Sequence, residues 1–162
     1  MIRHACKDDC LQLAALSIKV WLDTYAVEGI KREYAKYALT TFTESYFSAL
    51  LDSPDYNLLV VETDQVIQGY ALLNMNSHYQ SARSGFELEK LYIDTRFKGQ
   101  GLGKQLLNAV EHEFGNVYWL YTWVENESNG FYQYLGFRKI GQLNFEFAGT
   151  QIENNVYISA LI

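Results

Sequence analysis

A glycine-rich turn, Lys98–Lys104, is the part of this sequence whose residue types and spacing first suggest chemistry. It reads Lys-Gly-Gln-Gly-Leu-Gly-Lys and joins a strand-like stretch to a helix-like stretch. The first amides of a helix have no internal partners and carry positive potential, and glycines let an anion reach the backbone. The turn therefore predicts a phosphate-binding site. The structural alternative is a tight turn that only packs a helix against a sheet.

Two familiar phosphate-binding patterns do not fit this turn. A Walker P-loop needs Ser or Thr after Gly103-Lys104 and a glycine five residues before Gly103, where the chain has Gln105 and Lys98. The dinucleotide fingerprint G-x-G-x-x-G also fails, because its third glycine would fall on Lys104 or Leu106. The sequence therefore argues against ATP binding through this turn.

A second informative stretch runs from Trp123 to Phe137 and reads WVENESNGFYQYLGF. Asn126 follows a strand end and could donate a hydrogen bond to a ligand carbonyl, whereas a helix N-cap is the structural alternative for Asn126 and Asn129. Tyr132 lies on the helix that follows. A phenol beside a ligand can protonate a leaving thiolate at little cost, since thiol and phenol pKa values are close. Ordinary packing is the alternative for one tyrosine among 13.

The elements that must position these stretches can be read from hydrophobic spacing and turn residues. Strands are expected at Met1–Cys6, Asn57–Thr63, Val66–Met75, Phe86–Ile93, Val117–Val124, Arg138–Phe147 and Asn155–Leu161. Helices are expected at about 8–26, 31–51, 102–114 and 125–135. The 31–51 region is unusually aromatic, which favours packing but also allows a pocket wall.

This order predicts a mixed α/β layer fold. Strand 86–93, helix 102–114 and strand 117–124 form one right-handed crossover, so the two strands should be parallel. Ligands in such sheets bind at the carboxyl ends of the strands, where the glycine turn lies. In strand 86–93, Glu87 and Glu89 occupy the same alternation as Leu91 and Ile93, which predicts that all four share one face.

Length and composition point to one domain over residues 1–162. The net charge of −6 argues against nucleic-acid binding and suits a cationic substrate. No apolar run is long enough to span a membrane and no signal peptide is evident, so we expect a cytoplasmic protein without membrane contact. Cys6 and Cys10 have no second Cys or His pair with which to complete a zinc site, so no metal is expected.

The two stretches together resemble the GNAT superfamily of acetyl-CoA-dependent N-acetyltransferases. Leu88–Ile93 with Lys98–Leu107 matches one motif, and Trp123–Asn126 with Phe131–Phe137 matches the other. The resemblance covers nearly the whole chain and is strongest to small bacterial members that include polyamine acetyltransferases. It implies an α/β fold: a mixed, mostly antiparallel twisted sheet flanked by helices on both faces, with a splayed parallel strand pair at the cofactor site.

The resemblance also implies which residues bind acetyl-CoA, with no metal required. Backbone amides of the turn would hold the pyrophosphate, and strand residues would pair with the pantetheine arm. Lys98 stands where the family usually has Gln or Arg, and the spacing from Asn126 to Tyr132 is one residue short, so Asn129 is the alternative to Asn126. The cofactor-binding candidates are Leu91, Tyr92, Ile93, Lys98, Gly99, Gln100, Gly101, Leu102, Gly103, Lys104, Asn126 and Asn129.

For catalysis, the resemblance assigns Tyr132 as the general acid at the CoA sulfur. Glu87 and Glu89 are candidate bases for the amine, directly or through water, and the alternative is that they only bind a cation. The expected acceptor is a primary amine, on a small molecule or a protein N-terminus. A non-catalytic acyl-CoA-binding module is the competing function. An exposed edge of a closing strand would allow a homodimer.

Overall fold

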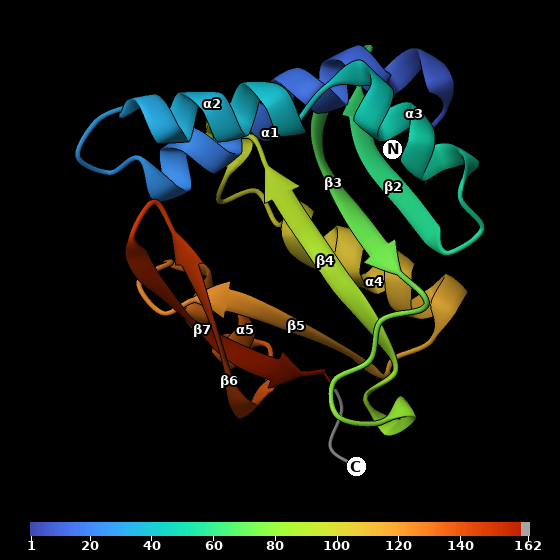
Figure 1. The fold of residues 1–162 in the computed structure, drawn as a ribbon. Helices are drawn as coiled ribbons and strands as arrows, with labels where there is room; N and C mark the ends of the chain where they lie inside the picture. The colour runs from blue at the N-terminus through green and yellow to red at the C-terminus, as the bar shows by residue number, and fades with distance from the viewer. Residues whose placement is uncertain (160–162) are drawn as a thin grey trace.

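The computed structural model describes residues 1–159, and its core is one seven-stranded sheet (Figure 1). The strand order is β1-β2-β3-β4-β5-β7-β6. The strands are β1 (Ile2–His4), β2 (Tyr56–Thr63), β3 (Val66–Asn74), β4 (Phe86–Ile93), β5 (Tyr118–Trp123), β6 (Arg138–Phe147) and β7 (Thr150–Ile158). The α-helices are α1 (Cys10–Tyr25), α2 (Arg32–Thr41), α3 (Glu44–Asp52), α4 (Leu102–Phe114) and α5 (Ser128–Tyr134).

The predicted mixed α/β fold is confirmed, with some changes at element ends. The helical region 31–51 is two helices, because Thr43 breaks it and its hydroxyl accepts a hydrogen bond from the amide of Tyr46, capping α3. The last strand begins at Thr150 rather than at Asn155, and the predicted end of that strand, 160–161, lies outside the described residues. Every strand pair except β4–β5 is antiparallel.

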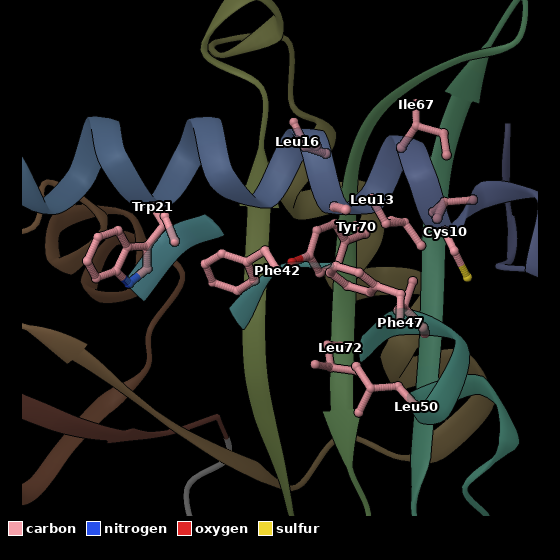
Figure 2. Close-up of a cluster of buried hydrophobic side chains, with 14 residues drawn as sticks. Cys10, Leu13, Leu16, Trp21, Phe42, Phe47, Leu50, Ile67, Tyr70 and Leu72 are labelled. Atoms are coloured by element: carbon pink, nitrogen blue, oxygen red, sulfur yellow. The ribbon is translucent and has the colours of Figure 1, made fainter. Parts of the chain in front are cut away.

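Helices cover both faces of the sheet, and each face has its own apolar core. Alternate side chains of β2 and β3 point to opposite faces, so Val60 and Leu72 pack toward α1–α3 while Leu59 and Leu73 pack toward α4. Figure 2 shows the first core, where the labelled side chains of α1 and α3 meet those of β3: Cys10, Leu13, Leu16, Phe47, Leu50, Ile67, Tyr70 and Leu72. The two cores hold β4 and α4 in fixed positions beside the glycine turn.

A charged cluster ties the first strand to α1 and to β2. The guanidinium of Arg3 donates to both carboxylate oxygens of Asp9, at 2.8 and 2.9 Å, and to Glu62 at 3.0 Å. The carboxylate of Asp9 also accepts from the amide of Cys6. The Arg3 hydrogen bonds hold the pKa of Asp9 at about 2, below its usual value of 3.8.

We expect Asp9→Asn to lower the free energy of unfolding by about 2 kcal/mol at pH 7. A carboxyl whose pKa is lowered by folding stabilises the protein above its unfolded pKa, and this contribution is lost as the pH falls from about 4 to about 2. Urea titrations of both proteins should therefore show a gap that shrinks by about half at pH 3. A gap that stays constant with pH would show that the charge of Asp9 does not stabilise the fold.

Strands β4 and β5 separate soon after they meet. Their parallel pairing is limited to Phe86 with Tyr118 and Glu87 with Trp119, and beyond these residues the two strands diverge (Figure 1). The edge of β4 that faces β5 therefore has no strand partner from Leu88 to Ile93 in the part of the chain that the structure describes. This confirms the predicted splayed parallel pair.

Candidate functional site

The V-shaped gap between β4 and β5 contains a cleft of about 720 Å³. It is lined by the glycine turn, the start of α5, strands β4 and β5, and side chains of α1 and α2. Of the predicted site residues, the cleft is lined by Glu89, Leu91, Tyr92, Ile93, Lys98, Gly99, Gly101, Leu102, Gly103, Lys104, Asn126 and Tyr132. Glu87, Gln100 and Asn129 do not line it.

The glycine turn presents open backbone to this cleft. Gly99 and Gly101 have φ values of 80° and 79°, a region that side chains other than Asn and Asp rarely adopt. A Cβ on Gly99 would meet nothing within 4 Å, so the space above the turn is free for a ligand. Gly101 is the N-cap of α4, and the first amide bonded within the helix is that of Gln105. The amides of residues 102–104 precede it and are available to an anion.

Gly103 has a packing role as well. A Cβ there would lie 3.2 Å from the ring of Phe131 on α5, and 3.8 Å from Leu91 on β4. The glycine therefore lets α4 approach α5 closely at the cleft. Gly99 and Gly101 therefore leave space for an anion, whereas Gly103 allows the two helices to pack closely.

Lys98 bridges the cleft at the glycine turn. Its ammonium lies 2.8 Å from the carboxylate of Glu127 at the start of α5, and both side chains are about half exposed or more. The hydrogen bond from Lys98 lowers the pKa of Glu127. An exposed ion pair of this kind contributes little to stability, so Lys98 can exchange Glu127 for another anion at low cost.

Tyr132 lies on α5 with only 6% of its surface exposed, and it borders the cleft. Phe131 and Phe137 pack on its ring, with centroids 5.2 and 5.3 Å away. Burial raises the pKa of the phenol well above its usual value of 10. The hydroxyl therefore keeps its proton at neutral pH and is available as a donor toward the cleft.

Asn129 holds the turn between β5 and α5. Its amide nitrogen donates to the carbonyls of Trp123, Val124 and Asn126, at 2.9, 3.3 and 2.7 Å. Its oxygen accepts from Asn155 and Tyr157, at 3.0 and 2.7 Å. These bonds occupy the whole side-chain amide, so Asn129 positions the start of α5 rather than facing a ligand.

Asn126 lies on the other side of the same turn and borders the cleft. Its side-chain oxygen accepts from the amide of Ser128, 2.9 Å away. That bond begins α5 at Ser128, three residues later than the sequence predicts. The amide nitrogen of Asn126 remains available as a donor toward the cleft.

A β-bulge sets the orientation of the two glutamates. Strand β3 pairs Leu73 with Leu88 and Leu72 with Lys90, which leaves Glu89 without an opposite residue. The extra residue reverses the alternation, so Leu88 and Leu91 both face α4. The prediction that Glu87 and Glu89 share a face with Leu91 and Ile93 was wrong, because simple alternation does not continue across a bulge.

The two glutamates have different surroundings. Glu89 lines the cleft, and its carboxylate lies 3.5 Å from the ammonium of Lys90. Glu87 is 7% exposed and lies next to Trp119 in the paired part of β4 and β5. Burial raises the pKa of Glu87, a hydrogen bond with Ser77 lowers it, and the charge of Glu89 raises it.

Aromatic rings wall the cleft on the face of the sheet that α1–α3 cover. The lining rings there are Trp21, Tyr25, Tyr37, Phe42 and Tyr121. The sequence suggested that aromatic residues of region 31–51 could form a pocket wall, and Tyr37 and Phe42 of this region do line the cleft. The contributions of Trp21, Tyr25 and Tyr121 were missed, because these residues match ordinary helix and strand patterns and only the folded chain brings them together.

No three His, Cys, Asp or Glu side chains within residues 1–159 are grouped so that they could hold a metal ion. None of the helices described above has the length and apolar character needed to cross a membrane.

Several known proteins similar to this chain are acetyltransferases. A curated relative, an uncharacterised N-acetyltransferase in the pepI 3′ region of Lactobacillus delbrueckii subsp. lactis, is 25% identical over 141 residues, covering 83% of this chain and 82% of the relative. A ribosomal-protein-alanine N-acetyltransferase from Brucella melitensis has a TM-score of 0.77 at 21% identity over 99% of each chain. The PaiA N-acetyltransferase of Thermoplasma acidophilum, solved with coenzyme A, has a TM-score of 0.70 at 17% identity over 96% of each chain.

The structural neighbours establish the fold, and the family match establishes the class of enzyme. The model of the acetyltransferase (GNAT) domain family matches residues 22–154, which is most of the chain and includes both the glycine turn and Tyr132. This protein therefore belongs to the GNAT acetyltransferases, a family of acyl-CoA-dependent enzymes.

Proposed function

We propose that this protein transfers the acetyl group of acetyl-CoA to a primary amine by direct attack. The observation that carries the proposal is the single cleft that joins an open glycine turn, an unpaired strand edge and a buried tyrosine. These features suit the phosphate, the amide-containing arm and the thioester of acetyl-CoA in that order. The structure of the similar Thermoplasma protein contains coenzyme A, which supports the same ligand here.

The turn and β4 would hold the cofactor. In this proposal, the amides from Gly99 to Lys104 bind the pyrophosphate, and Lys98 and Lys104 add positive charge. The backbone of Leu91–Ile93 pairs with the pantetheine arm as a further strand would, because that edge of β4 lacks a partner. Asn126 donates to the same arm from the opposite wall of the cleft.

Acetyl-CoA supplies the acetyl group as an activated thioester. The acceptor nitrogen forms the new amide bond as the carbon–sulfur bond breaks, a backbone amide near Leu91–Ile93 polarises the carbonyl, and Tyr132 gives its proton to the departing sulfur. Glu89 takes the proton lost by the nitrogen, directly or through water, because it is the glutamate that lines the cleft. Glu87 does not line the cleft, and in this proposal it influences Glu89 only through its charge.

We expect Glu89→Gln to lower kcat/KM about 10- to 100-fold at pH 7. The amide keeps the size of the side chain but cannot accept the proton. Glu87→Gln is the matched comparison, with an expected loss below about threefold since that residue lies outside the cleft lining. The reverse ranking would assign the base to Glu87, and unchanged rates in both variants would assign it to water.

The direct test of the function is acetyl-CoA-dependent thiol release, screened against polyamines, aminoglycosides, amino acids and peptides with a free N-terminus. Calorimetric titration with coenzyme A is run in parallel. Release with one class of amine is the expected result. Tight binding of coenzyme A without release on any amine would favour the alternative, a non-catalytic acyl-CoA-binding module, and absent binding would refute the proposal.

A further inference from the structure

The two halves of the sheet touch again where the V is widest. One half carries α1 and α2 above β4, and the other is formed by β5, β7 and β6. Phe147, at the tip of the β6–β7 hairpin, lies against three rings of the first half: Trp21, Tyr34 and Tyr37, with centroids 5.8, 5.6 and 5.5 Å away. Figure 1 shows this hairpin tip beside the ends of α1 and α2.

A second contact lies next to the first. Trp123, at the end of β5, stacks on Tyr25 of α1 with centroids 5.4 Å apart and an angle of 30°. Tyr25 follows Trp21 by one helical turn, and these two rings are themselves 5.0 Å apart. We call the six rings of these contacts the aromatic bridge: Trp21, Tyr25, Tyr34, Tyr37, Trp123 and Phe147.

The aromatic bridge closes one end of the cleft. Trp21, Tyr25 and Tyr37 line the cleft with one side and contact Phe147 or Trp123 with another. An extended peptide needs about 4.7–4.9 Å on each side of its backbone before it meets a neighbouring chain. Rings already in contact at 5.4–5.8 Å leave no such passage between α1–α2 and the hairpin.

We propose that the aromatic bridge restricts the acceptor to small primary amines and excludes peptide and protein N-termini. An acceptor must fit between the bridge and β4, and it cannot extend between the two halves of the sheet. The chamber that remains offers the carboxylate of Glu89 to an ammonium group and the partly exposed ring of Tyr121 to a carbon skeleton. This inference rests on the proposed acetyl transfer.

The test compares two acceptors, alanine amide and tetra-alanine amide, which have the same free α-amino group and differ only in length. The best small amine of the thiol-release screen is measured alongside them. The wild-type protein should acetylate the small amines at least about 100-fold more efficiently, in kcat/KM, than the tetrapeptide. Phe147→Ala should raise kcat/KM for the tetrapeptide at least about 10-fold, because it opens a passage at the hairpin tip.

Two further variants test whether a gain in tetrapeptide acetylation comes from opening the aromatic bridge or from a general loosening of the structure. Tyr34→Ala removes a ring of the bridge from the other half without touching the cleft lining, and it should admit the tetrapeptide as Phe147→Ala does. Phe145→Ala is the matched control, since this ring lies on the same strand but contacts Tyr121 within its own half, and it should leave the preference unchanged. Thermal melting of each variant reports its folding.

The outcomes distinguish this inference from the function on which it rests. Efficient wild-type acetylation of tetra-alanine amide would overturn the bridge proposal and leave acetyl transfer intact. The bridge proposal would also be overturned if the folded variants Phe147→Ala and Tyr34→Ala preferred small amines over the tetrapeptide as strongly as the wild type does. Binding of coenzyme A without thiol release on any amine would remove the proposed function, and the bridge proposal with it.

Discussion

Replacing Tyr132 with Phe is expected to lower kcat about 100- to 1,000-fold while coenzyme A affinity changes less than about twofold. The ring remains and keeps its contacts with Phe131 and Phe137, so the helix and the cleft wall are preserved. Only the proton for the departing sulfur is lost. Steady-state kinetics together with calorimetry on coenzyme A measure the two quantities separately.

The matched control is Tyr134→Phe, on the same helix. Tyr134 is 87% exposed, so loss of its hydroxyl should leave kcat unchanged. Burial raises the pKa of Tyr132, and an acid must be protonated to act, so wild-type activity should show no decline from this group up to about pH 10. An unchanged kcat in Tyr132→Phe would remove this residue from the mechanism and leave water as the proton donor.

Replacing Gly101 with Asp is expected to weaken coenzyme A binding at least 100-fold, equivalent to about 3 kcal/mol. Two unit charges 4 Å apart near a protein surface repel by about 4 kcal/mol, and the new carboxylate would face the cofactor phosphates. Gly101 has a left-handed backbone with φ of 79°, which strains any side chain, although Asp and Asn tolerate it best. Asp and Asn at this position should therefore lower thermal stability by similar small amounts, whereas only Asp should lose the binding of coenzyme A.

Gly101→Asn is the partner variant for this test. Asn has nearly the same shape, tolerates the left-handed backbone and carries no charge. A Cβ here would meet only the end of Gln105, 3.8 Å away, so both side chains fit. We expect the Asn variant to retain most of the affinity, measured by the same calorimetry. Equal affinity in the Asp and Asn variants would place the phosphates away from this turn.

Local chemistry explains why part of the site was visible in the sequence. Three glycines in five residues at the start of an amphipathic helix predict an open helix N-terminus wherever the chain folds, because positive φ values and free amides are properties of the turn itself. The crossover from strand to helix to strand likewise predicts the parallel pair β4–β5 from chain order alone. The family resemblance then supplied the expected role of Tyr132.

Other features depend on contacts between distant segments. The bulge at Glu89 exists because β3 pairs with Leu88 and Lys90 and leaves one residue between them, and no pattern within β4 indicates it. The roles of Asn126 and Asn129 separated only when Tyr157 and Asn155 of β7 were seen to bind the side chain of Asn129. Two similar asparagines three residues apart are equivalent in sequence but not in a folded turn.

By itself, the sequence determined the class of fold, the glycine turn and the helix that carries Tyr132, whereas the separation of the two parallel strands was expected only from the family resemblance. The first three features follow from the spacing of residues within short segments, where backbone geometry decides the outcome. Only the tertiary structure decided which glutamate faces the cleft and which aromatic rings close its end. The aromatic bridge joins residues from 21 to 147, and such contacts form only when the packing of two cores brings the helices and the hairpin together.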